Sequence, residues 1–292
     1  MHRARTGRRI PLVATFPGLG YTFLQQSSPT LRVIFRRFVA KTGRRAAAAW
    51  PDLWATFETD HDRSQIVGSF GVPFERTIVT KGTGLDLSAF AVDEKNFDAP
   101  LTLLFAGRLL RSKGVSAFLD AARLLGASQF RWLIAGWRYE SPDALTDDEV
   151  DALRHSRHFD FLGAVSDMPA LLRKTHALVM PSTYPEGIPR ILIEAAAASI
   201  PMITTDFPGA RELVRHDNTG FILEEASGAA ILKAAQSLVA LPGRGKAMGL
   251  RARELVRSGG FDSASVQREF LNVYEAAMHG RPLSSISPAR QL

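Results

Sequence analysis

The chain has 292 residues, of which 46% are hydrophobic and 22% charged; its net charge is +7 and it contains no cysteine. This composition is ordinary for a soluble globular α/β protein, and the length allows one large domain or two smaller ones. It excludes disulfide frameworks and thiolate metal sites. The lack of an apolar run of about 18–20 residues excludes a chain inserted in a bilayer.

The positive charge is concentrated near the start of the chain, where basic residues come before almost every acid. They are Arg3, Arg5, Arg8, Arg9, Arg32, Arg36, Arg37, Lys41, Arg44 and Arg45. Such asymmetry favours an anionic partner. Because no zinc-finger spacing, RNP-like aromatic pattern or convincing helix-turn-helix accompanies it, we interpret that partner as a membrane surface rather than a nucleic acid.

Short apolar runs predict strands at residues 10–15, 53–59 and 77–80, with a helix at residues 60–69 between the last two. The Gly-x-Gly in Pro17-Gly18-Leu19-Gly20-Tyr21 predicts a tight turn. A dinucleotide site would need a third glycine and a following acid, and both are absent. An NAD-dependent oxidoreductase is therefore disfavoured.

Pro29–Ala49 predicts a basic amphipathic helix. We expect an apolar side made of Leu31, Ile34, Phe35, Phe38 and Val39, and a basic side made of Arg32, Arg36, Arg37 and Arg44. Two interpretations stay open: a helix packed on its own domain with solvated arginines, or an interfacial helix lying on anionic lipid.

From residue 101 onward, strands and helices alternate. Strands are predicted at residues 101–105, 130–135, 158–162, 177–180, 201–204 and 220–223, and helices at 115–125, 147–155 and 168–174. This alternation predicts a parallel, Rossmann-like sheet. A last helix is predicted at residues 261–278, with Phe270, Val273 and Tyr274 spaced for one face.

One strand, loop and helix at residues 177–198 carries two acids. The loop is punctuated by prolines and Gly187, and in an open parallel sheet it lies at the edge where ligands bind. The helix start suits an anion such as a phosphate. Glu186 lies in the loop and Glu194 follows eight residues later, just over two helical turns, so both acids face the same side. Solvation explains Glu194 equally well when it is taken alone.

Arg108 and Lys113 lie in the loop after the strand at residues 101–105. Two cations in one such loop suit a diphosphate, because a guanidinium engages two oxygens and an ammonium acts as a point charge. Taken alone, such a pair is more often solvated.

The string PEGIPRILIEAAA, from Pro185 to Ala197, resembles the Glu-x(7)-Glu signature of the retaining GT-B glycosyltransferases of group 1 (family 4). GRLLRSKG at residues 107–114 resembles the phosphate loop of that family. Residues 81–90 resemble the segment in which the amino domain passes to the carboxyl domain, and residues 91–100 would then be the linker between the domains. The resemblance implies an α/β GT-B fold, with two Rossmann-like domains and parallel sheets.

The resemblance also implies a domain division. Residues 1–97 would be a partial amino-terminal, acceptor-side domain with its linker, since only about 95 residues stand where a domain of ~100–150 is typical. Residues 98–260 would bind the nucleotide sugar, and residues 261–292 would form a terminal helix across the cleft and a tail.

The family's roles transfer by resemblance to matching positions. Arg108 and Lys113 would bind the donor diphosphate and stabilise the charge that builds on it, Glu186 would hydrogen-bond the donor sugar, and Glu194 would accept from the ribose hydroxyls. Further donor contacts are expected from Gly107, Gly136, Leu162, Gly187, Ile188 and Pro189.

The implied reaction is transfer of a sugar, with retention, from a nucleotide sugar such as a UDP-sugar to a lipid-linked or polysaccharide acceptor in cell-surface glycan synthesis. No metal is expected. Asp60-His61-Asp62 imitates the Asp-x-Asp metal site of another glycosyltransferase fold, but acids are common where a helix begins. A lone His176 is interpreted as structural. We expect a cytoplasmic protein, peripheral on the inner face of the membrane. The alternative is a non-catalytic remnant that binds a nucleotide sugar.

Overall fold

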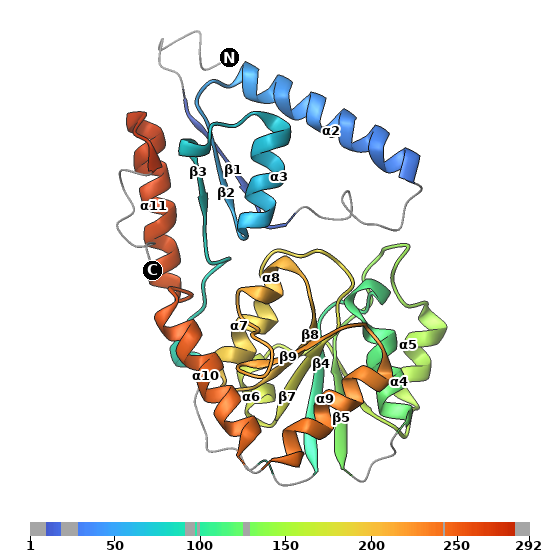
Figure 1. Ribbon diagram of the computed structural model, residues 1–292. Coiled ribbons are helices and arrows are strands. Elements are labelled where there is room, and N and C mark those ends of the chain that lie inside the picture. Colours follow the sequence, from blue (N-terminus) through green and yellow to red (C-terminus); the bar gives the residue numbers. More distant parts are fainter. Residues whose placement is uncertain are drawn as a thin grey trace. The chain divides into compact units, whose positions relative to one another are not determined.

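The computed structural model describes residues 10–18, 29–90, 97, 100–124, 129–241 and 243–283 (Figure 1). The side chains at residues 29–32 and 34–36 are also outside this description. Several predictions therefore lie outside the described residues: the basic residues 3–9, Leu19 to Tyr21 of the glycine-containing turn, most of the linker at 91–100, and the faces of Leu31, Arg32, Ile34, Phe35 and Arg36.

The chain divides into two compact units. We call one the amino unit, which consists of Met1–Gly84, Pro185–Ile188 and Ser263–Leu292. The other, the carboxyl unit, consists of Leu85–Tyr184 and Pro189–Asp262.

The amino unit is built on a three-stranded parallel sheet in the order β1-β2-β3. Its elements are β1 (Leu12–Phe16), α2 (Pro29–Ala49), β2 (Leu53–Phe57), α3 (Asp60–Phe70), the short helix η2 (Phe74–Arg76), β3 (Thr77–Val79) and α11 (Ser263–His279). Successive side chains of a strand point to opposite faces. Accordingly, Phe57 of β2 packs with Ile66 of α3, whereas Trp54 packs with Val273 of α11.

The acids at residues 60–62 open a helix, as predicted. Thr59 is the N-cap of α3, and its side chain accepts a hydrogen bond from the Asp62 N–H at 3.0 Å. Asp60 pairs with Arg63 one turn later, at 2.6 Å. The helix ends at Gly71, whose φ of 71° is a left-handed conformation that glycine adopts without strain.

The carboxyl unit contains a six-stranded parallel sheet in the order β6-β5-β4-β7-β8-β9. The strands are β4 (Leu101–Ala106), β5 (Phe130–Ala135), β6 (Asp160–Gly163), β7 (Ala177–Met180), β8 (Met202–Thr205) and β9 (Gly220–Leu223). The strand order reverses between β4 and β7. A parallel α/β sheet with this reversal confirms the Rossmann-like prediction.

Helices cover the six-stranded sheet, with α4 beside α9 and α7 beside α10 (Figure 1). The helical elements are η3 (Leu87–Ala89), η4 (Arg111–Lys113), α4 (Val115–Leu124), α5 (Asp147–Arg154), α6 (Met168–Arg173), α7 (Arg190–Ala197), α8 (Pro208–Arg211), α9 (Gly228–Ala240) and α10 (Arg244–Ser258). An aromatic group fills the core on the α4 side: the Phe118 ring lies 5.8 Å from Phe105 and 5.2 Å from Trp132.

His176 has a structural contact, as interpreted from the sequence. Its Nδ1 accepts the backbone N–H of Thr102 at 2.9 Å, and its own backbone N–H donates to the Thr102 carbonyl at 2.8 Å. The imidazole thus joins the beginnings of β4 and β7.

The predicted face of α11 is wrong in part, and one residue of the predicted apolar side of α2 is exposed. In α11 the buried side chains are Val266, Val273, Ala276 and Ala277, while Tyr274 is 46% exposed. In α2, Phe38 is 64% exposed, because the packed position is Gly43, where an added Cβ would lie 2.4 Å from the Phe70 ring. Phe38 precedes Gly43 by five residues, or about 140° around the helix.

Among the described residues, the α-helices α8, α9 and α10 and the short helices η2, η3 and η4 were not predicted from the sequence. Most other bounds agree to within a residue or two; β6, for example, begins at Asp160 rather than at residue 158. Among the described residues, no helix is both long and apolar enough to cross a bilayer.

Candidate functional site

The loop after β4 is held tightly against the end of β7. It runs from Gly107 through η4 to Gly114, where φ is 81°. A Cβ on Gly114 would lie 2.2 Å from the Pro181 carbonyl oxygen. Glycine is therefore required here both for its conformation and for the close approach of two backbones.

Hydrogen bonds join the same two loops. The Ser112 carbonyl oxygen accepts from the Thr183 N–H at 2.8 Å and from the Ser182 hydroxyl at 3.2 Å. β4 and β7 are neighbours at the reversal of strand order, which is the place where open α/β sheets bind ligands. In the carboxyl unit, the loops after β4 and β7 are therefore joined by hydrogen bonds at the edge of the sheet where ligands bind.

Glycines bring the ends of β5 and β6 to this edge as well. The Gly107 N–H donates to the Ala135 carbonyl at 2.9 Å, and the Gly136 N–H donates to the Gly163 carbonyl at 2.8 Å. A Cβ on Gly136 would lie 2.1 Å from the Gly107 carbonyl oxygen, so only glycine fits. Leu162, 41% exposed, lies in β6 beside them.

The basic residues of the β4 loop have different surroundings. Arg108 is partly buried, and its guanidinium lies 5.1 Å from the centre of the Tyr139 ring. Lys113 is also partly buried. Arg111 instead donates to both carboxylate oxygens of Glu149, at 2.8 and 2.6 Å. These bonds, helped by the Thr146 N–H, lower the pKa of Glu149 to about 2, so Arg111 is engaged by α5.

The segment before α5 braces the β4 loop, and sequence reasoning missed it. The carboxylate of Asp143 accepts from the Ser112 N–H at 3.0 Å and from the Ser112 hydroxyl. The Asp143 carbonyl accepts from the Arg111 N–H at 2.9 Å. No local pattern marks Asp143, because its partner lies 31 residues away.

Glu194 is buried in α7, with 9% of its surface exposed. The helix begins after Pro189, and the Arg190 Nε donates to Glu194 Oε1 at 2.8 Å. Glu194 is therefore not a solvent-exposed acid on the polar face of a surface helix, which was the alternative interpretation of this residue taken alone. A carboxylate at such a position is held in one orientation, which is what recognition of a hydroxyl pair needs.

Glu186, Gly187 and Ile188 lie in a segment, Pro185–Ile188, that belongs to the amino unit. There the Ile188 N–H donates to Glu58 Oε2 at 2.7 Å. A Cβ on Gly187 would lie 2.3 Å from the Pro17 carbonyl oxygen. Sequence reasoning missed Glu58, because the strand predicted at residues 53–59 includes it. In the structure β2 ends at Phe57, so Glu58 lies just beyond the strand, at the edge where ligands bind.

The structure therefore places the predicted residues in two groups. In the carboxyl unit, Gly107, Arg108, Lys113, Gly136 and Leu162 lie at the ends of β4, β5 and β6, and Pro189 and Glu194 lie at and in α7. In the amino unit, Glu186, Gly187 and Ile188 lie with Glu58.

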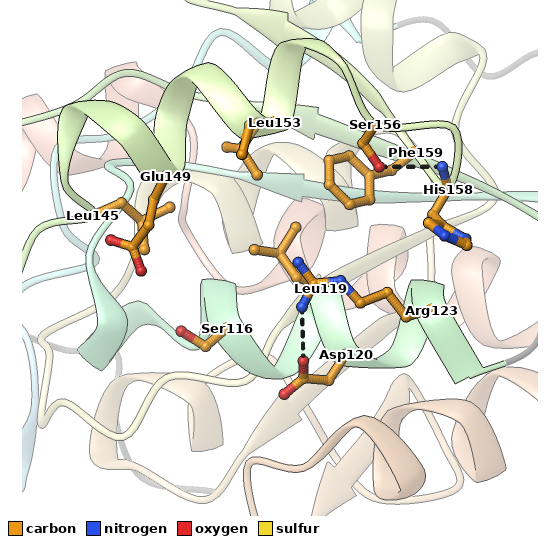
Figure 2. Close-up of a pocket in the computed structure, with 11 residues that line it drawn as sticks. Ser116, Leu119, Asp120, Arg123, Leu145, Glu149, Leu153, Ser156, His158 and Phe159 are labelled. Atoms are coloured by element: carbon orange, nitrogen blue, oxygen red, sulfur yellow. Dashed lines mark hydrogen bonds and ion pairs between the residues drawn. The ribbon is translucent and has the colours of Figure 1, made fainter.

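A separate cavity of about 340 Å³ lies between α4 and α5 (Figure 2). Its lining residues are Ser116, Leu119, Asp120, Arg123, Leu145, Glu149, Ala152, Leu153, Ser156, His158 and Phe159. None of the predicted donor-binding residues is among them. Over the part of the chain that the structure describes, no three His, Cys, Asp or Glu side chains are grouped so as to hold a metal ion.

Comparison with known proteins identifies the class. Residues 89–255, more than half of the chain, match the family described as glycosyl transferases group 1. The chain belongs to this family.

Curated relatives are similar over part of their length. The chain is 24% identical over 172 residues to the capsular polysaccharide biosynthesis glycosyltransferase CapM of Staphylococcus aureus, covering 58% of this chain and 44% of CapM. It is 29% identical over 213 residues to glycogen synthase of Mycobacterium tuberculosis, covering 70% and 50%. The chain thus spans about half the length of the curated relatives it matches.

Solved structures share the fold. HepE of Anabaena, solved with UDP and glucose, has a TM-score of 0.72 at 19% identity over 91% of this chain and 72% of HepE. Sucrose-phosphate synthase of Thermosynechococcus elongatus has a TM-score of 0.74 at 18% identity over 96% and 71%. The α/β GT-B fold expected from the sequence is confirmed.

Proposed function

We propose that this chain carries the donor-binding machinery of a retaining glycosyltransferase that moves a sugar from a UDP-sugar to a lipid-linked or polysaccharide acceptor in cell-surface glycan synthesis. The observation that carries the proposal is the loop after β4. It holds Arg108 and Lys113 and is fixed to the end of β7 where the strand order reverses. Membership of the glycosyl transferase group 1 family supports the same reaction class.

In this proposal each residue has one task. Arg108 and Lys113 bind the diphosphate and stabilise the charge that develops on it as the donor bond breaks. Glu194 accepts hydrogen bonds from the ribose, Gly136 and Leu162 border the base, and Glu186 binds hydroxyls of the donor sugar.

The chemical step needs no nucleophile from the protein. The bond between the sugar C1 and the diphosphate oxygen breaks, and a new bond forms between C1 and the acceptor hydroxyl oxygen on the same face. The hydroxyl proton passes to the leaving diphosphate, which balances the reaction. Interactions that grow stronger with the charge on the diphosphate are those that accelerate this step.

For the acceptor, we propose docking on an anionic membrane surface at the cytoplasmic face. The exposed side of α2 carries Arg37, Lys41, Arg44 and Arg45 together with Phe38, and the helix contains no acid. Each cation near anionic lipid contributes about 1 kcal/mol. A Campylobacter jejuni relative, 26% identical over 173 residues, is named for an undecaprenol-diphosphate-linked acceptor.

Titration calorimetry with UDP, GDP and ADP tests the donor site. We expect micromolar binding of UDP, at least tenfold weaker in Glu194→Ala and in Arg108→Ala. Arg123→Ala is the matched control, because Arg123 is an exposed cation on α4 that lines the separate cavity. Failure of all three nucleotides to bind would refute the proposal. Binding without donor hydrolysis or transfer would instead favour a non-catalytic, nucleotide-sugar-binding remnant.

Vesicle flotation tests the membrane surface. The chain should float with phosphatidylglycerol vesicles and not with phosphatidylcholine vesicles, and it should be released by salt because screening weakens exposed charges. Lys41→Glu with Arg45→Glu should abolish flotation. Equal flotation with both lipids would contradict an electrostatic contact.

A further inference from the structure

Glu58 is a buried acid to which the proposed reaction assigns no task. It directly follows Phe57, the last residue of β2, the central strand of the amino unit, and only 8% of its surface is exposed. A buried carboxyl group is costly unless it is hydrogen-bonded. The buried carboxyl group of Glu58, at the carboxyl end of a parallel strand, therefore needs a specific hydrogen-bond partner.

That contact is the backbone of the segment Pro185–Ile188. Glu58 Oε2 accepts the Ile188 N–H at 2.7 Å. Gly187 fits between two groups: an added Cβ would lie 2.2 Å from Glu58 Oε2 and 2.3 Å from the Pro17 carbonyl oxygen. A carboxylate and the backbone of the turn after β1 therefore both approach the segment closely at Gly187.

The surroundings of Glu58 shift its pKa, so the charge of this carboxyl group depends on pH near neutrality. Burial raises the pKa of Glu58 to about 7, the hydrogen bond from Ile188 opposes the rise, and the nearby acids Asp62 and Glu186 add to it. Glu58 and Glu186 therefore influence each other electrostatically within the amino unit. A change in the charge or position of Glu58 therefore also affects Glu186.

We propose that Glu58 is a positioning residue that fixes the backbone at Gly187 and Ile188 and thereby directs Glu186 toward the donor sugar. The inference rests on the proposed function, in which Glu186 binds sugar hydroxyls. The nucleotide contacts assigned to Arg108, Lys113 and Glu194 lie in the carboxyl unit, so Glu58 acts on recognition of the sugar and not of the nucleotide.

The test compares UDP with UDP-glucose as calorimetric probes. We expect Glu58→Ala to bind UDP-glucose at least tenfold more weakly than the wild type, with UDP affinity unchanged within twofold. Glu58→Gln keeps an acceptor oxygen for the Ile188 N–H and should stay within threefold of the wild type for both probes. Glu75→Gln removes an exposed acid of the same unit and serves as the control.

A second variant covers the case in which Glu58→Ala does not fold. Glu58→Asp keeps the charge but is one methylene too short to reach the Ile188 N–H, and it should show the same selective loss of UDP-glucose affinity. Equal losses of both probes, or no loss in either variant, overturn the inference. A wild type that binds neither probe overturns the proposed donor site, and with it this inference, so the two failures are distinct.

Discussion

The pH dependence of stability gives a direct measure of how buried Glu58 is. Burial raises the pKa of this carboxyl group from 4.5 to about 7. The folded state therefore holds the Glu58 proton more tightly than the unfolded state does. The contribution of Glu58 to the free energy of unfolding is then greatest below pH 4.5, falls as the pH rises, and levels off above pH 7.

The size of the effect follows from the same values. Each tenfold change in proton affinity corresponds to about 1.4 kcal/mol, so the rise in the pKa of Glu58 predicts a loss of about 3 kcal/mol between pH 4.5 and pH 8. Glu58→Gln removes the titration and keeps the hydrogen-bond acceptor. The difference between the two proteins therefore reports the titration of Glu58 together with its interaction with the charges of Asp62 and Glu186.

Amide hydrogen exchange of the peptide that carries β2 reports on the amino unit alone. After correction for the intrinsic pH dependence of exchange, the wild type should lose about 3 kcal/mol of protection relative to Glu58→Gln over this range. A difference that does not change with pH would mean that Glu58 titrates at its ordinary value, and the argument from burial would fail.

Three further predictions concern the carboxyl unit. Gly114→Ala should lower stability by about 1–3 kcal/mol and weaken UDP binding, since its methyl group meets the Pro181 carbonyl; unchanged melting and binding would contradict the close approach. Arg111→Ala should raise the pKa of Glu149 from about 2 toward 4.5 in an NMR titration, and a static value would exclude the ion pair. Phe118→Ala should lower the free energy of unfolding, measured by denaturant titration, by about 3–5 kcal/mol. Amide hydrogen exchange of the β2 peptide should not change. A loss below about 1 kcal/mol would mean that the core around Phe118 is poorly packed.

Much of the local structure could be predicted because it depends on short-range periodicity. The helix Pro29–Ala49 and the strands Phe130–Ala135, Ala177–Met180 and Gly220–Leu223 have the predicted bounds. The motif residues Arg108 and Lys113 also lie in one loop simply because they are close in sequence.

Some helices escaped prediction because tertiary packing outweighs local propensity. In α10 a Cβ on Gly249 would lie 2.0 Å from the Ser199 carbonyl oxygen, and one on Gly245 would lie 2.3 Å from the Phe97 ring. Glycines weaken a helix locally by up to about 1 kcal/mol each, so they argue against a helix in the sequence. In the fold they allow the close contacts that hold it.

The sequence by itself determined the class of fold, because that class depends on the alternation of strands and helices. It also determined the family and the positions of the cations and acids that we assign to the donor, because these depend on spacing within one loop or between a loop and the next helix. Only the tertiary structure decided which distant residues hold the site loops in place through hydrogen bonds. Ser112 meets Thr183 across 71 residues, and Glu58 meets Ile188 across 130. Such contacts form when the ends of separate strands meet, and no local pattern encodes that meeting.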